Sequence, residues 1–251
     1  MNTRQTNFVL LAVILLAGAS ACATKSPGRP DYSLGFEPVD RASMALIGPL
    51  SQDRAAFERI KELESSGALG TLDGTRELKN VLHGSSQTML AATAPSLFRA
   101  GVFAGTPELI DISCNAMRRV THAGLRRSNG LAAFEQACDA LAGSAAAQTQ
   151  GSCPSVQKLV GAYQSLRGGD EKKARKEAAA GLRDQGLCPN SRPLVRTPVT
   201  PDSRGFIVVV TLQAMGTAPA TYLANETAPH TADSINAAFA QNARMIKNGD
   251  S

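Results

Sequence analysis

The chain has 251 residues, of which 43% are hydrophobic, enough to bury one ordinary core. Only 4% are aromatic and none is Trp, so the core is predicted to consist mainly of Ala, Leu, Val and Met on packed helices. The net charge of +5 is spread along the chain without a long run of one sign, which argues against nucleic acid as a partner.

Residues 1–21 have the pattern of a signal peptide. A short polar start with one base, Arg4, precedes the apolar run Phe8–Ala17. This run is too short to span about 30 Å of hydrocarbon as a mature helix. The next four residues, Ala19-Ser20-Ala21-Cys22, contain an Ala-x-Ala cleavage site, so we predict that the mature chain begins at Cys22.

The same tetrapeptide resembles the lipobox of bacterial lipoproteins, in which small residues precede a Cys that receives a diacylglycerol. Ala19 differs from the large aliphatic residue most common at that position. The Pro-, Gly- and Ser-rich stretch Ala23–Pro38 has the composition of a flexible tether, as expected behind a lipid anchor. Cys22 is also the odd member of five cysteines, which acylation would explain.

The resemblance implies a lipid anchor on Cys22. Because Ala23 rather than Asp follows the Cys, it further implies the periplasmic side of the outer membrane. A soluble periplasmic protein, or an intermolecular disulfide through Cys22, is the alternative.

The fold is predicted to be mainly α: antiparallel helical hairpins forming a bundle, with two disulfides, a small C-terminal β-hairpin and a terminal helix. The predicted parts are a signal peptide (1–21), a flexible tether (22–50), a helical domain (51–190), and a C-terminal segment (191–251) that packs on it.

Apolar residues at helical spacing predict helices over Ser51–Ser66 and Thr75–His83, with Gly67 and Gly84 as stop signals. A third helix is predicted over Gln87–Ala94, because Pro95 begins or bends the next one.

Thr106-Pro107-Glu108 is a strong start signal, with an N-cap hydroxyl, a Pro at the first helical position and an acid in the first turn. The predicted helix runs to His122 with Leu109, Ile112, Cys114, Met117 and Val120 facing inward. A turn over Gly124–Gly130 leads to a second helix, Leu131–Leu141. Cys114 and Cys138 lie equally far from the turn, so this hairpin predicts a disulfide between them.

A second helical hairpin is predicted between Cys153 and Cys188. Its first helix starts at Pro154, with Val156, Leu159, Val160, Tyr163 and Leu166 inward; Gly168-Gly169 ends it, and Asp170 caps a helix that ends at Gly186. Both cysteines then lie at the open end of the hairpin, which predicts a Cys153–Cys188 disulfide. The other pairings would join the two hairpins, and a tightly folded Gly143–Gly151 link would allow either.

The remaining segment changes in composition. The β-branched run Phe206–Leu212 and the stretch Leu194–Val199 flank turn residues, which predicts a β-hairpin, although so short an apolar run is also compatible with a buried helix. An amphipathic helix, Thr231–Lys247, closes the chain. Among all these elements, the side chains predicted to be largely buried are Phe57, Ile60, Leu109, Met117, Phe134, Leu159 and Tyr163.

No metal site, cofactor motif or catalytic residue is predicted. His83, His122 and His230 are far apart and lack a zinc-binding spacing. Ser155-Val156-Gln157-Lys158 resembles the S-x-x-K of penicillin-recognising enzymes, but the later K-T-G is missing, and Lys247-Asn248-Gly249 is only its nearest counterpart. We therefore interpret Ser155 and Lys158 as part of a solvated helix start.

The stretch Gly169–Leu182 resembles the second helix of a tetratricopeptide repeat, but no second copy exists and an ordinary hairpin is preferred. Its bases, Lys172, Lys173, Arg175 and Lys176, are interpreted as a solvated face, with anionic lipid or glycan as the alternative contact. The expected function is a non-catalytic envelope lipoprotein that binds a protein partner; the alternative is an envelope enzyme or small-ligand binding protein with an unfamiliar site.

Overall fold

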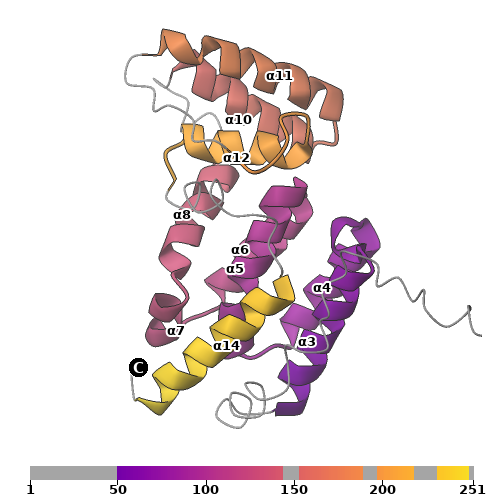
Figure 1. Cartoon of the computed structure of the whole chain (residues 1–251), viewed down its shortest axis with the longest axis vertical. Coiled ribbons are helices and arrows are strands. Elements are labelled where there is room, and N and C mark those ends of the chain that lie inside the picture. Colours follow the sequence, from indigo (N-terminus) through magenta and orange to yellow (C-terminus); the bar gives the residue numbers. More distant parts are fainter. Residues whose placement is uncertain (1–49, 144–152, 189–196, 218–230, 249–251) are drawn as a thin grey trace, which may run out of the picture. The chain divides into compact units, whose positions relative to one another are not determined.

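The computed structural model describes residues 50–143, 153–188, 197–217 and 231–248. In these ranges it is mainly helical and contains no strand (Figure 1), and all of them belong to one compact unit, Ser33–Ser251. In chain order the elements are α3 (Leu50–Ser65), the 3₁₀ turn η2 (Ala68–Gly70), α4 (Leu72–His83), α5 (Gln87–Ala104), α6 (Pro107–Arg118), α7 (Ala123–Ser128), α8 (Leu131–Ala142), α10 (Pro154–Arg167), α11 (Glu171–Arg183), the 3₁₀ turn η3 (Asp184–Leu187), α12 (Arg204–Ala214) and α14 (Thr231–Lys247).

Several helices begin where a side-chain oxygen accepts a hydrogen bond from a backbone N–H of the first turn. Such caps satisfy amide groups that have no partner within the helix. The pairs are Thr71 Oγ1 with the N–H of Gly74, Ser86 Oγ with Met89, Asp170 Oδ1 with Lys173, and Ser203 Oγ with Phe206. Thr106 precedes α6 as predicted, but its hydroxyl makes no capping hydrogen bond.

Helix α5 is the most buried helix of the first half of the chain and packs against α6, α12 and α14. It runs through Pro95, so the prediction of a helix over Gln87–Ala94 was too short. A Pro inside a helix costs about 3 kcal/mol because one backbone hydrogen bond is lost. Residues on both sides of Pro95 are fully enclosed, Ala94 and Leu97 among them, and this burial offsets the cost.

Helix α6 ends at Arg118 rather than at the predicted His122. Beyond it, the Arg119 guanidinium donates to the carbonyls of Leu82 and His83, each at 2.9 Å. The Gln87 side chain accepts from the N–H groups of the next turn, including that of His122 at 3.0 Å. These polar contacts end α6 before the predicted residue. Most of the segment 124–130, which was predicted as a turn, belongs to the short helix α7.

The inward face of α6 also differs slightly from the prediction. Ile110 is buried, whereas Ile112 is only half-buried. Because α6 packs mainly on α5, its buried stripe is centred on the α5 side and includes Ser113. The other residues predicted to face inward here, including Val120 just beyond α6, are buried, as are all seven side chains predicted to be largely buried.

Helices α10 and α11 form the predicted antiparallel hairpin. Ala174, Ala178 and Gly181 of α11 are buried against α10, and a Cβ on Gly181 would lie only 2.8 Å from Leu159 Cγ. The second helix ends at Arg183 rather than at Gly186, and the four residues after it form η3.

The predicted β-hairpin of Leu194–Val199 with Phe206–Leu212 was wrong. The second segment lies in α12, while residues 194–196 fall outside the described ranges. Ser203 caps this helix, and every residue from Ile207 to Leu212 is buried. A helix that is apolar on all sides belongs in a core, where packing outweighs the strand preference of β-branched residues. The alternative of a buried helix is therefore the one observed.

Helix α14 has the predicted bounds, Thr231–Lys247. Both oxygens of the Glu64 carboxylate on α3 accept backbone N–H groups at its start, from Thr231 at 2.8 Å and Ala232 at 3.0 Å. A carboxylate is favourable there because it faces the positive end of the helix dipole. The rings of Phe57 and Phe239 then pack edge to face between α3 and α14.

Candidate functional site

The first candidate site is a groove of about 760 Å³ between α8, α10 and the end of α12, here called the α8–α10–α12 groove. A hollow of this size falls in the range of small-molecule sites. Its lining residues are Ala132, Glu135, Gln136, Asp139, Ala140, Val156, Val160, Ala214, Met215 and Thr217.

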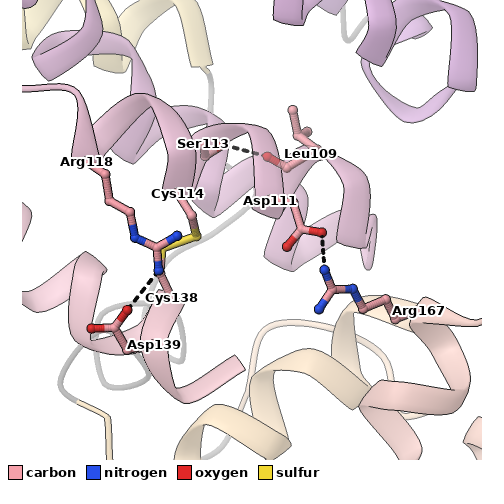
Figure 2. The surroundings of a disulfide bond; sticks show 8 residues. All are labelled: Leu109, Asp111, Ser113, Cys114, Arg118, Cys138, Asp139 and Arg167. Atoms are coloured by element: carbon pink, nitrogen blue, oxygen red, sulfur yellow. Dashed lines mark hydrogen bonds and ion pairs between the residues drawn. A yellow bond between two sulfur atoms is a disulfide. The ribbon is translucent and has the colours of Figure 1, made fainter. Parts of the chain in front are cut away.

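One wall of the groove is polar and comes from α8. Glu135, Gln136 and Asp139 stand at three- and four-residue spacing, so they share one face of that helix. Glu135 is paired with Arg126. Asp139 accepts from Arg118 at 2.8 Å, and Figure 2 shows this second pair. The Asp139–Arg118 pair is well exposed and therefore weak, so a partner's base can compete for this carboxylate.

The opposite wall is apolar. Val156 and Val160 follow each other by one turn on α10, and Ala214 and Met215 lie at the end of α12. Val156 and Met215 are only half-buried, which leaves apolar surface facing the groove. The groove is thus amphipathic.

A disulfide joins the helix of each wall, α8 or α10, to a neighbouring segment. The two disulfides are those predicted. Cys138 on α8 bonds Cys114 on α6, with the Cα atoms 5.8 Å apart, and Figure 2 shows this bridge beside the Arg118–Asp139 pair. Cys153, directly before α10, bonds Cys188, directly after η3, with the Cα atoms 5.6 Å apart.

An ion pair joins α6 and α10. Asp111 on α6 accepts from Arg167 at the end of α10 at 2.7 Å (Figure 2). Tyr163, one turn before Arg167, is buried, and burial together with the nearby Asp111 carboxylate raises the pKa of its phenol. Tyr163 therefore stays neutral throughout the physiological range and does not act as a base there.

A second, smaller groove of about 440 Å³ lies between α5, the α7–α8 turn and α14. Small side chains such as Ala92, Ser96 and Ala237 line most of it. The Arg99 guanidinium lies over the Phe134 ring, 5.4 Å from its centroid. This cation–π contact positions the Arg99 guanidinium at the edge of the groove.

The residues of the S-x-x-K motif have structural roles, and the interpretation of Ser155 as part of a solvated helix start was wrong. The Ser155 hydroxyl is buried and donates to the carbonyl of Gly181 at 2.6 Å, and Lys158 is paired with Asp184. Within the described ranges no group of His, Cys, Asp and Glu side chains is arranged to hold a metal ion. His83 and His122 are exposed at helix ends, and His230 lies outside those ranges.

Of the predicted site residues, Cys22 lies outside the described ranges, as do the tether and the signal peptide. In the part of the chain that the structure covers, no helix combines the length and apolar character needed to cross a bilayer. No protein-family model, curated protein or solved structure matches the chain.

The α8–α10–α12 groove was not predicted from the sequence. Val156 was predicted to face inward like Leu159, and its helical spacing is indeed that of a core residue. The pattern shows which side of a helix is apolar, but not where a neighbouring helix stops short of covering it. Nothing in the sequence pattern around Met215, just after α12, predicted that this residue lines a groove.

Proposed function

We propose that this chain is a membrane-anchored envelope lipoprotein, acylated on Cys22, whose helical body binds a segment of another envelope protein without catalysing a reaction. The observation that carries the proposal is the α8–α10–α12 groove, with carboxylates on one wall and aliphatic side chains on the other. The segment that fits it is an amphipathic helix or strand with bases toward α8 and apolar side chains toward α10 and α12.

The cysteine pairing supports the anchor. Four of the five cysteines form the two disulfides, which leaves Cys22 as the thiol outside them. In an oxidising compartment an unpaired thiol is a liability, and acylation removes it. The lipobox-like residues before Cys22 favour this modification.

The anchor is tested by mass spectrometry of the full protein extracted from membranes. We expect an N-terminal peptide that begins at a diacylated Cys22, and release of the Cys22→Ser variant into the soluble periplasmic fraction. An unmodified Cys22 on a soluble periplasmic form would refute the anchor.

The groove is tested in intact cells by placing a photo-crosslinking amino acid at Val156 or at Met215. We expect both positions to crosslink the same envelope protein, and the groove-filling Ala140→Trp substitution to abolish both products. The control position is Leu72 on α4, which is 69% exposed and does not line the groove. It should give no such product.

Crosslinks that persist with Ala140→Trp, or that arise equally from Leu72, would contradict binding in the groove. A small molecule that co-purifies with the protein and is displaced by Ala140→Trp would favour the ligand-binding alternative instead.

A further inference from the structure

The outer face of α11 carries a stripe of bases. Lys172, Lys176 and Arg183 are all exposed, and at 100° per residue they fall within about 40° of one another on the helix. The stripe spans about 16 Å of the helix axis. None of these side chains is paired with an acid in the part of the chain that the structure describes.

The acids near this face are directed elsewhere. Glu177 accepts from Ser165 of α10 at 2.8 Å, which draws its carboxylate toward the hairpin interface. Asp184 is paired with Lys158 of α10, and Glu171 with Arg175. The positive charge of the stripe is therefore not cancelled by neighbours on its own face.

The orientation of the stripe is fixed by the opposite side of α11. There, Ala174, Ala178 and Gly181 pack so closely on α10 that the helix cannot rotate without a clash at Leu159. Among the described elements, α11 contacts α10, α12 and η3, and the face with Lys172, Lys176 and Arg183 remains open.

An exposed apolar side chain stands at the end of the stripe. Leu187, four residues after Arg183 in η3, is 79% exposed, the largest value among the described large hydrophobic side chains. The next residue, Cys188, is bonded to Cys153, so the disulfide fixes the position of η3. A leucine held in water next to a row of bases has the chemistry of a bilayer-contacting segment.

We propose that α11 and η3 dock on an anionic phospholipid bilayer, with Lys172, Lys176 and Arg183 contacting lipid phosphates and Leu187 entering the headgroup–acyl boundary. Leu187 favours a bilayer over a bare polyanion, because a polyanion has no apolar region to receive an aliphatic side chain. The inference rests on the proposed anchoring at Cys22, which would hold the body within reach of a membrane. A basic patch acting beside a lipid anchor is a common way to strengthen attachment.

The test uses the absence of Trp from the chain. Leu187→Trp in the full-length mature chain, with Cys22→Ser so that acylation plays no part, is mixed with vesicles of equal parts phosphatidylcholine and phosphatidylglycerol. We expect a blue shift of the emission and quenching by brominated lipid. Leu72→Trp, placed at the other exposed leucine, should show neither.

Charge variants then separate the stripe from the overall net charge. Replacing Lys172, Lys176 and Arg183 together by Gln should weaken vesicle binding on the order of 100-fold, because each base near the surface contributes a factor of about 5 and the three factors multiply. Replacing three other exposed bases, Lys79, Arg127 and Arg244, by Gln removes the same charge from α4, α7 and α14 and should have little effect. Binding should also fall as NaCl is raised.

The proposal is overturned if the Leu187→Trp emission is unchanged by anionic vesicles, if Leu72→Trp responds equally, or if both triple variants lose binding alike. Binding to an acidic polypeptide without binding to vesicles would overturn it as well. Since the protein tested lacks acylation, failure here is distinguishable from failure of the anchor at Cys22.

Discussion

Two glycines on facing helices show how single residues set the spacing of α10 and α11. A Cβ on Gly181 would lie 2.8 Å from Leu159 Cγ and 3.1 Å from the carbonyl oxygen of Ser155, whereas a Cβ on Gly161 meets nothing closer than 3.6 Å. Both positions are helical, so an alanine lowers the conformational entropy of the unfolded chain equally at each. Only the contacts differ.

We therefore expect Gly181→Ala to destabilise the protein by about 1–3 kcal/mol through overpacking. Gly161→Ala should instead stabilise it by about 0.5–1 kcal/mol, the usual gain in a helix interior. Urea unfolding followed by circular dichroism measures both. Equal effects of the two substitutions would show that the hairpin spacing is not set by Gly181.

Ion pairs on the surface mainly change the pKa values of their own carboxyl groups. The Arg175 guanidinium, 2.5 Å from the Glu171 carboxylate, lowers the pKa of that group, and Arg59 lowers the pKa of Glu77 in the same way. A carboxyl whose pKa is lowered in the folded state stabilises the fold above its ordinary pKa. That stabilisation is lost as pH falls through the lowered value.

Arg175→Gln should raise the Glu171 pKa toward the ordinary value of a glutamate and leave the pKa of Glu77 unchanged. Arg59→Gln should do the reverse, so each variant is the control for the other. Carboxyl-carbon NMR titration reads both groups. A Glu171 pKa that does not rise in Arg175→Gln would assign its depression to another cause.

At the scale of whole elements, the sequence was most informative where local signals and packing agree. The terminal helix Thr231–Lys247 and the starts of α8 and α10 were predicted from apolar spacing, from Gly130 before α8, and from Pro154 at the first position of α10. The segment Phe206–Leu212 was predicted wrongly as a strand because its β-branched residues resemble a buried strand. The segment forms a helix because neighbouring helices bury it on every side, and its own sequence does not show those neighbours.

The disulfides were predictable for a related reason. Two antiparallel helices place residues at equal distances from their turn at the same height, which holds for Cys114 and Cys138 and applies equally to Cys153 and Cys188. The groove was not predictable, since Val156 has the same periodicity whether α8 covers it or not. A groove forms where a neighbouring helix makes no contact, and the spacing of apolar residues along one helix does not show where that happens.

Each disulfide closes a loop whose entropy it removes from the unfolded chain. The separations are 24 residues for Cys114–Cys138 and 35 for Cys153–Cys188. Loops of these lengths predict losses of about 3–4 kcal/mol when either pair is replaced by serines. Denaturant titration of the two double variants tests this, and a loss below about 1 kcal/mol would show that packing alone holds the hairpin concerned.

At the scale of the whole molecule, the described helices form two groups, one around α5 and one around α12. The two groups are connected mainly through the contact of α5 with α12. Helices α6 and α14 pack against α5, and α3 packs against α14 and α4, while α10 and α11 contact α12. Gly205 lies at a close approach between α12 and α5. A Cβ there would lie 1.8 Å from the carbonyl oxygen of Phe103, and backbone atoms cannot move aside as a flexible side chain would.

Gly205→Ala should therefore cost more than about 3 kcal/mol, the upper part of the range for overpacking, because the start of α12 must shift away from α5. The matched control is Gly84→Ala, whose Cβ meets nothing within 4 Å and whose backbone is right-handed, so its effect should stay within about 0.5 kcal/mol. Thermal unfolding distinguishes them, since each kcal/mol lowers the midpoint by about 2–4 °C in a domain of this size. If α5 and α12 form one cooperative unit, the Gly205→Ala transition moves to lower temperature as a single step. A split into two steps would instead mean that α10, α11 and α12 unfold independently of the helices around α5.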